Sequence, residues 1–166
     1  MKKLILLTLL TVFISCSKQS NSSSYDENVK IVKKFLELQA SESGFEDQLE
    51  MIHPEVMWQP AFHGASQVGK EAMGQYLKGW QDAMEGVVYT PENYLPGVSA
   101  DTKLADGSVR SYGKWTGIHS ATGKSWELTS YHTWDFKDGK IVAGGDYFDA
   151  GGLTNFLKEP TSSETE

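Results

Sequence analysis

The sequence predicts an α+β fold in which a curved antiparallel sheet packs against three helices. Two patterns support this prediction. Apolar residues recur mainly at helical spacing over the first half of the chain, whereas after residue 86 they alternate with polar residues, as in strands with one buried face. The last two strand-like segments flank Asp138-Gly139, a dipeptide typical of a tight hairpin turn.

Helices are expected mainly in the first half of the domain. Apolar residues at helical spacing follow Asp26, a potential N-cap, and a second short run stops at His53-Pro54, because the residue before a proline disfavours helical backbone. Gly69 precedes a third such run. The expected helices cover residues 27–40, 45–52 and 70–84, and a strand over residues 56–62 separates the last two.

Four more strands are expected in the second half. Pro91 and Pro96 interrupt the first of them, which makes it irregular or places it at a sheet edge, since proline cannot donate a ladder hydrogen bond. We interpret residues 26–158 as one domain and expect the acidic tail over residues 159–166 to be disordered. The expected strands cover residues 87–98, 109–119, 126–136 and 140–148, followed by a helical turn over residues 151–157.

The N-terminus predicts export and a lipid anchor. Lys2-Lys3 precedes an apolar run over residues 4–14, which has the size of a signal-peptide core and is shorter than the roughly 20 residues that a spanning helix needs. The run Phe13-Ile-Ser-Cys resembles the bacterial lipobox, in which the signal is cut before the cysteine and the cysteine carries lipid. This resemblance implies a signal peptide over residues 1–15 and a lipid on Cys16. An ordinary secretory signal with an incidental cysteine is the alternative.

The residues after the cysteine predict a tether. They are polar and rich in serine, so residues 16–25 are expected to form the lipidated Cys16 and a flexible link to the domain. Ser17, and not an aspartate, follows the cysteine; under the sorting rule of enteric bacteria this implies the outer membrane. The expected location is therefore the bacterial cell envelope, with membrane contact through the lipid.

Composition and charge argue against several classes of function. The 166 residues include 15 Lys and Arg against 22 Asp and Glu, a formal net charge of -7, so we expect no nucleic-acid partner. The single cysteine excludes an internal disulfide and a cysteine-based zinc site. No two of the four histidines have metal-ligand spacing with a carboxylate, so we expect neither a metal nor another cofactor.

Several motifs together resemble a known family. They are His53-Pro-Glu-Val after the second expected helix, Gly69-Lys-Glu-Ala at the third, and a final hairpin that begins Tyr131-His-Thr-Trp and closes on Asp146-Tyr-Phe-Asp. With them, the domain resembles the SnoaL-like branch of the nuclear transport factor 2-like superfamily. The resemblance implies a cone around a pocket and, in many members, a homodimer. Because the superfamily includes both enzymes and non-catalytic binders, the fold does not decide the function.

The alternation of the hairpin predicts which side chains face the interior. Along residues 126–136, one face is apolar except for Ser130 and His132, and we expect this face to point inward. The two polar side chains are then buried or line the pocket.

The turn decides whether Asp146 joins them. A three-residue turn over Lys137-Asp138-Gly139, with the glycine in a bulge position, pairs Asp146 with Ser130 and points it inward, diagonal to His132. We favour this turn. A two-residue turn would instead place Gly145 opposite His132 and direct Asp146 outward.

The resemblance implies roles for two of these residues. His132 and Asp146 have the spacing that a pocket histidine and the catalytic aspartate have on this hairpin in SnoaL-like cyclases. Asp146 would then be the general base and His132 its hydrogen-bonding neighbour; a carboxylate in an apolar cone is a stronger base because burial disfavours its charge. Ser130 stands where the family has a pocket glutamine, and this departure argues against cyclase activity.

The function that we expect is the binding of a small, largely apolar molecule in the pocket. One alternative is a lyase, isomerase or cyclase that uses Asp146 as its base, and another is a non-catalytic protein-interaction module. An open pocket with an inward Asp146 favours either of the first two functions, whereas a filled core favours the third. The expected ligand-binding residues are Ser130, Trp134, Trp58, Trp115 and Tyr112, for which core packing is the other interpretation.

Overall fold

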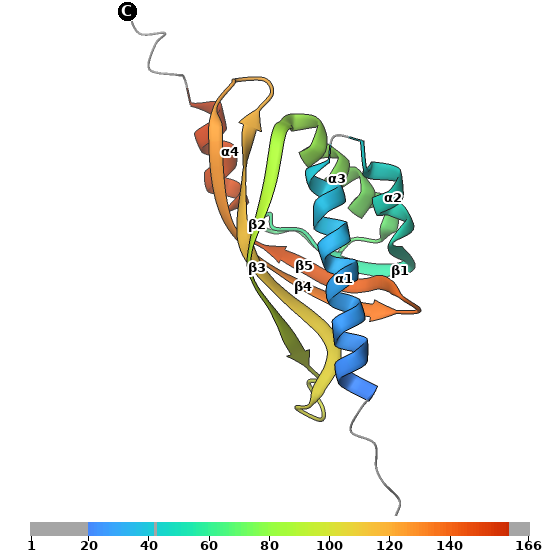
Figure 1. The fold of residues 1–166 in the computed structure, drawn as a ribbon. Helices are drawn as coiled ribbons and strands as arrows, with labels where there is room; N and C mark the ends of the chain where they lie inside the picture. Colours follow the sequence, from blue (N-terminus) through green and yellow to red (C-terminus); the bar gives the residue numbers. More distant parts are fainter. Residues whose placement is uncertain (1–19, 42, 160–166) are drawn as a thin grey trace, which may run out of the picture.

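The structure is a computed structural model that describes residues 20–41 and 43–159 (Figure 1). The expected signal peptide, Cys16, the first part of the expected tether and the residues after 159 lie outside the described residues. The order of elements is α1 (Ser20–Ala40), α2 (Phe45–Glu50), β1 (Ile52–Gln59), α3 (Lys70–Ala83), β2 (Met84–Val98), β3 (Ala105–His119), β4 (Ser125–Lys137), β5 (Lys140–Tyr147) and α4 (Ala150–Lys158).

The strands form one mixed sheet in the order β1-β5-β4-β3-β2. The strands from β2 to β5 are antiparallel to one another, as expected, but β1 runs parallel to β5. The expectation of a wholly antiparallel sheet is therefore wrong at one edge. The reason is connectivity: α3 and three strands separate β1 from β5 along the chain, so no hairpin turn sets the direction of β1.

Several elements begin earlier than expected, among them α1 and β1. Helix α1 begins at Ser20, so the last part of the expected tether is helical. Strand β1 begins at Ile52 and contains Pro54, which an edge strand accepts because one of its sides needs no ladder bonds. Strand β2, which contains Pro91 and Pro96, forms the opposite edge, as expected.

The helices lie mainly on one face of the sheet. Figure 1 shows α1 and α3 over this face, with α2 beside them and α4 next to the far ends of β3 and β4. The expected terminal turn is a complete helix, α4, whose first turn is capped by Asp149: its Oδ1 accepts a hydrogen bond from the backbone N–H of Gly152 across 2.7 Å. The largest fully buried hydrophobic side chains between the helices and the sheet are Trp58, Trp134, Phe35, Ile52, Met73 and Ile141.

The β4–β5 hairpin differs from the predicted one at its turn. Lys137 pairs with Lys140 across a two-residue Asp138-Gly139 turn, whose φ angles of 52° and 72° suit a type I′ turn. The expected three-residue turn is therefore wrong. A bulge shortly after the turn shifts the register again, so that Asp146 lies directly opposite His132 instead of diagonal to it. Asp146 faces inward, as expected, but through a different pairing.

Gly144 permits the close approach of strands beside this bulge. Its φ of 153° lies in the region that favours glycine. A Cβ atom there would lie 2.0 Å from the carbonyl oxygen of Thr133 and 2.7 Å from the Trp58 ring. The residue at this position must therefore lack a side chain if β5 is to deliver Asp146 to the interior.

Candidate functional site

A cavity of about 70 Å³ lies between the sheet and helices α1 and α3. This is several times the roughly 10–15 Å³ that one water molecule needs, and it leaves room for a molecule of a few non-hydrogen atoms. Most of the lining side chains are aromatic or aliphatic. They are Phe35, Leu36, Gln39, Trp58, Tyr76, Leu77, Trp80, Met84, Val87, Trp115, Trp126, Leu128, His132, Trp134, Asp146 and Phe148.

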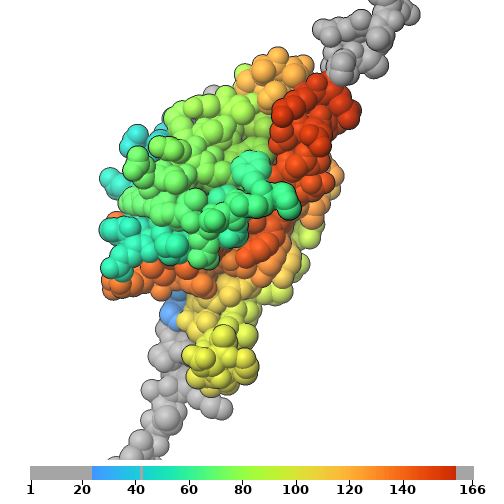
Figure 2. All heavy atoms as spheres, turned by 180° about the vertical axis from the view of Figure 1, so that it is seen from behind, coloured from blue at the N-terminus to red at the C-terminus, as the bar shows by residue number. Residues whose placement is uncertain are grey.

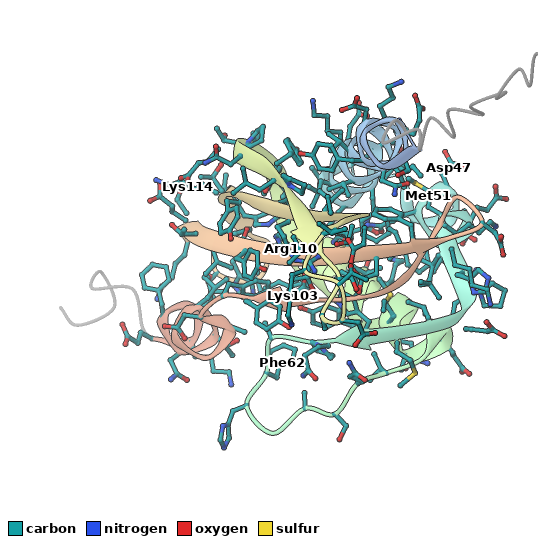
Figure 3. The ribbon with its side chains drawn as sticks, turned by 90° about the horizontal axis from the view of Figure 1, so that it is seen from below. Asp47, Met51, Phe62, Lys103, Arg110 and Lys114 are labelled. Atoms are coloured by element: carbon teal, nitrogen blue, oxygen red, sulfur yellow. The ribbon has the colours of Figure 1, made fainter. Side chains whose placement is uncertain are left out.

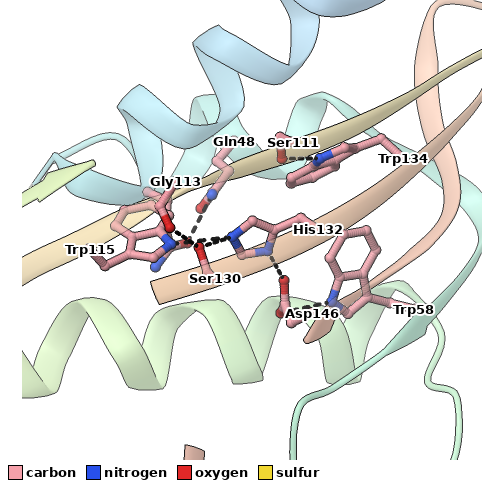
Figure 4. A network of polar contacts seen from close by, with 10 residues as sticks. Gln48, Trp58, Ser111, Gly113, Trp115, Ser130, His132, Trp134 and Asp146 are labelled. Carbon is pink, nitrogen blue, oxygen red and sulfur yellow. Dashed lines mark hydrogen bonds and ion pairs between the residues drawn. The ribbon is translucent and has the colours of Figure 1, made fainter. Parts of the chain in front are cut away.

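His132 on β4 and Asp146 on β5 form the polar centre of this cavity (Figure 4). Asp146 Oδ1 lies 2.6 Å from His132 Nδ1. The two residues are only 7% and 3% exposed, respectively. A contact this short between buried groups is a charge-assisted hydrogen bond, which fixes the orientation of both side chains.

Contacts on the other side of the imidazole define its protonation. Trp115 Nε1, which can only donate, lies 3.3 Å from His132 Nε2. The Ser130 hydroxyl lies 2.9 Å from the same nitrogen and also within reach of the Gly113 carbonyl oxygen. Because Trp115 Nε1 can only donate, Nε2 offers it a lone pair, so the ring proton lies on Nδ1 and donates to Asp146.

The Asp146 carboxylate has hydrogen-bond donors but no cationic partner. Its Oδ2 accepts a hydrogen bond from Trp58 Nε1 across 3.2 Å, and its Oδ1 accepts the one from His132. The described residues that line the cavity include no lysine, no arginine and no other acid. The only ion-pair geometry of Asp146 in the described part of the chain is with the neutral His132. The cavity thus holds one buried carboxylate without a countercharge.

Two buried polar atoms of the lining residues have no hydrogen-bond partner among the described residues: the Tyr76 hydroxyl and Trp126 Nε1. Burial raises the pKa of Tyr76, and the negative charge of Asp146 raises it further, so the phenol keeps its proton. Because buried polar atoms in folded proteins are normally paired, these two are available to polar groups of a ligand.

Sequence reasoning placed Tyr76 and Trp80 in a helix but not in the pocket. The structure places both in the cavity wall. Their spacing of four residues puts them on one face of α3, and this face carries the apolar stripe that packs towards the sheet. That spacing is the signal that could have identified them.

The structure brings most of the predicted pocket residues together. Trp58, Trp115 and Trp134 line the cavity, as do His132 and Asp146. Ser130 is buried and contacts His132, but it is not one of the lining residues. Its hydroxyl therefore serves the imidazole and does not face the cavity.

The predicted place of Tyr112 in the pocket is wrong. Tyr112 stacks on Tyr131 with 4.7 Å between ring centroids, and Tyr131 stacks on Tyr147 at 5.4 Å, on the outer face of the sheet. Trp115 lies three residues along the same strand, and such positions face opposite sides because strand side chains alternate. Arg110, labelled in Figure 3, shares the outer face and lies 3.5 Å from a carboxylate oxygen of β4.

A surface groove adjoins the cavity. Tyr76, Trp80 and Met84 border both hollows, and the groove continues between Phe62 and helix α4. Phe62 lies parallel to Trp80 with 6.3 Å between ring centroids. Figure 2 shows the segment that carries Phe62 on the surface beside α4.

The part of the chain that the structure describes contains neither a metal-binding cluster nor a membrane-spanning helix. No cluster of three or more His, Cys, Asp or Glu side chains there could hold a metal ion. Over residues 20–41 and 43–159, no helix is both long enough and apolar enough to cross a membrane.

Comparisons with known proteins agree with this architecture. A sequence model of the SnoaL-like domain matches residues 32–144. A proposed isomerase from Bacillus subtilis aligns with a TM-score of 0.65 at 18% identity, covering 80% of this chain and 93% of that chain. A proposed SnoaL-like polyketide cyclase from Jannaschia sp. CCS1 aligns with a TM-score of 0.66 at 16% identity, covering 82% and 94%.

A third similar structure contains a small molecule. It is a protein with a ketosteroid isomerase-like fold from Catenulispora acidiphila DSM 44928 in complex with trimethylamine. It aligns with a TM-score of 0.62 at 12% identity and covers 79% of this chain and 94% of that chain. At these identities the alignments show the fold. The comparison with curated proteins finds no match.

Proposed function

The chain belongs to the SnoaL-like domain family, and from this premise we propose that the domain binds a small, largely apolar molecule in the cavity between the sheet and helices α1 and α3. The observation that carries the proposal is the composition of the cavity wall. Aromatic and aliphatic side chains surround one polar pair, His132 and Asp146. Ligand sites of this kind combine apolar walls with a few polar groups that orient the ligand.

The size of the cavity supports a ligand of few atoms. About 70 Å³ holds a compact molecule and not a polycyclic one. Trimethylamine in the Catenulispora protein is such a compact molecule on a domain of the same fold. Tyr76 and Trp126 each have a buried hydrogen-bond donor without a partner among the described residues. The ligand should therefore carry at least one hydrogen-bond acceptor atom.

Catalysis is the second candidate, and one observation favours it. Asp146 is buried, is held in place by His132 and Trp58, and borders the cavity, which is where a general base must stand to reach a substrate. A lyase, isomerase or cyclase reaction would use this carboxylate to remove a proton from carbon, with the neutral Tyr76 hydroxyl as a donor to the developing oxyanion. The similar isomerase and cyclase structures are compatible with such a reaction.

A protein-interaction module is the weaker candidate. It would need no open cavity and no inward carboxylate, whereas this domain has both.

We retain three proposals from the sequence: export, anchoring of Cys16 in a bacterial envelope membrane by lipid, and assembly as a homodimer. Incorporation of labelled palmitate would test the anchor, and light scattering of the domain without its first 24 residues would test the dimer.

The test of the proposed function uses the indole N–H signals of the tryptophans. We expect small neutral molecules, such as acetone and propan-2-ol, to shift these signals in a saturable manner in proton–nitrogen NMR spectra. Val87→Phe fills the cavity and should abolish the shifts, because Val87 lines it. Val88→Phe is the matched control, since its neighbour Val88 is 54% exposed.

Two outcomes would contradict the proposal. One is the absence of saturable shifts in the unmodified domain with every neutral probe. The other is shifts that survive in Val87→Phe as fully as in Val88→Phe, which would place the bound molecule outside the cavity. The thermal unfolding midpoint of each variant shows beforehand whether it is folded.

A further inference from the structure

The cavity combines a negative charge with a largely aromatic wall. All five tryptophans of the chain line it. Aromatic faces carry negative potential and hold an ammonium group at about 0.5–2 kcal/mol per favourable contact, depending on desolvation. Asp146 supplies a full negative charge on the same wall. These two features are independent of each other and select the same kind of ligand.

The protein leaves this carboxylate without a countercharge. Trp115 donates to Nε2 of His132, which keeps the imidazole neutral, and Nδ1–H only donates a hydrogen bond to Asp146. No lysine or arginine occurs among the described lining residues. A buried carboxylate is costly unless a positive charge accompanies it, and the free space beside Asp146 is where that charge would be placed.

We propose that the ligand is a small organic cation, a tertiary or quaternary ammonium compound, which sits among the tryptophans and neutralises Asp146. This inference rests on the proposed function, because it identifies the ligand of the same cavity. Methylated ammonium groups are compact and weakly hydrated, so they enter an apolar cavity more readily than a primary ammonium does. Trp126 Nε1, which lacks a partner, suits a hydroxyl or carbonyl oxygen elsewhere on such a molecule.

The same charges exclude other ligands. An anion in the cavity would face Asp146 across the same low-dielectric space, with no cationic side chain in the described lining to offset the repulsion. A neutral apolar molecule would fit the walls but would leave the carboxylate unneutralised. The order of affinity is therefore cation, then neutral molecule, then anion.

Three probes of similar size separate these cases. Trimethylammonium carries the cation; propan-2-ol is a neutral molecule of similar size; acetate carries an anionic group. In calorimetric titrations we expect trimethylammonium to bind at least about tenfold more tightly than the alcohol, and the anion not to bind. The preference should survive 0.5 M sodium chloride, since salt screens a buried pair much less than a surface pair.

The Asp146→Asn variant tests whether this carboxylate causes the preference for the cation. We expect the variant to bind the alcohol still and to prefer trimethylammonium by less than about threefold, because the tryptophan contacts alone remain. Asp101→Asn is the control; it removes the same charge from an exposed position between β2 and β3 and should leave the preference unchanged.

Each result has a distinct meaning. If the unmodified domain binds the alcohol as tightly as trimethylammonium, the cation proposal is wrong and the proposed apolar site remains. If it binds neither of these probes nor acetone, both proposals are wrong. If Asp101→Asn reduces the preference as much as Asp146→Asn, the overall acidity of the chain causes it, and the assignment to the cavity fails. The comparison of trimethylammonium with the alcohol in the unmodified domain remains decisive even if Asp146→Asn does not fold.

Discussion

His132 and Asp146 are direct cross-strand partners, and their side chains meet at 2.6 Å between Nδ1 and Oδ1. Two adjacent strands thereby hold a buried acid and its donor in one orientation. Side chains directly opposite each other on antiparallel strands are closer than diagonal ones, which explains how so short a contact forms without distortion of the hairpin. The position of the carboxylate in the cavity therefore depends on the β4–β5 register.

The first prediction concerns the stability that this pair contributes. His132→Ala removes one of the two hydrogen-bond donors of a buried carboxylate and should lower the free energy of unfolding by about 3–5 kcal/mol. Urea denaturation at neutral pH measures the loss. His63→Ala is the control, because His63 is exposed, and it should change stability by less than about 0.5 kcal/mol. Equal effects of the two substitutions would show that the pair is not important for folding.

The second prediction concerns the backbone that delivers Asp146. Gly144→Ala introduces a Cβ atom that would overlap the Thr133 carbonyl oxygen, at a φ that disfavours any side chain. We expect a loss of about 3 kcal/mol or more. Gly139→Ala is the matched control: its φ is also positive, but nothing lies within 4 Å of the added atom, so about 1 kcal/mol should be lost. Similar losses at the two positions would mean that β5 can move away from β4.

Much of the site could be predicted from alternation along single strands. The inward face of β4 followed from its apolar pattern, because a half-buried strand must turn one set of alternate residues to the core. The prediction for Tyr112 is wrong for the same physical reason. Trp115 on its strand has the opposite parity, and a regular strand cannot direct both side chains inward.

The pairing between strands was harder to predict. Asp138-Gly139 suits either a tight turn or a bulged one, and the bulge near Ile141 compensates for the tight turn only in the context of the whole sheet. The parallel direction of β1 has no local signal either, since its partner is β5, which lies far along the chain. Long-range pairing depends on which sheet edge remains free after the hairpins form, and a single segment does not contain that information.

The third prediction concerns the protonation of His132. Because Trp115 Nε1 can only donate to Nε2, the imidazole should carry its proton on Nδ1. Long-range proton–nitrogen NMR distinguishes the two ring nitrogens and gives the tautomer directly. A doubly protonated ring, or a proton on Nε2, would contradict the hydrogen-bond pattern, and it would also remove the unneutralised charge on which the cation proposal depends.

The fourth prediction concerns the Tyr76 hydroxyl, which is buried without a hydrogen-bond partner among the described residues. Tyr76→Phe removes a buried hydroxyl whose desolvation no hydrogen bond compensates. The free energy of unfolding at pH 7 should therefore stay equal or rise by up to about 1 kcal/mol. Urea denaturation of the variant at pH 7, beside Tyr147→Phe as an exposed control, measures this effect. A loss above 1 kcal/mol at Tyr76 alone would reveal a hydrogen bond that the hydroxyl makes in solution.

The same hydroxyl should also govern part of the alkaline stability. Burial and the charge of Asp146 raise the pKa of Tyr76 in the folded domain, whereas in the unfolded chain a tyrosine releases its proton near pH 10. Above that pH the unfolded state binds fewer protons than the folded state, so the free energy of unfolding falls as pH rises, by about 1.4 kcal/mol per pH unit for one such group. Tyr76→Phe should reduce the slope between pH 10 and 11.5 by this amount. Parallel slopes in the variant and the unmodified domain would show that the phenol ionises as readily in the folded cavity as in water.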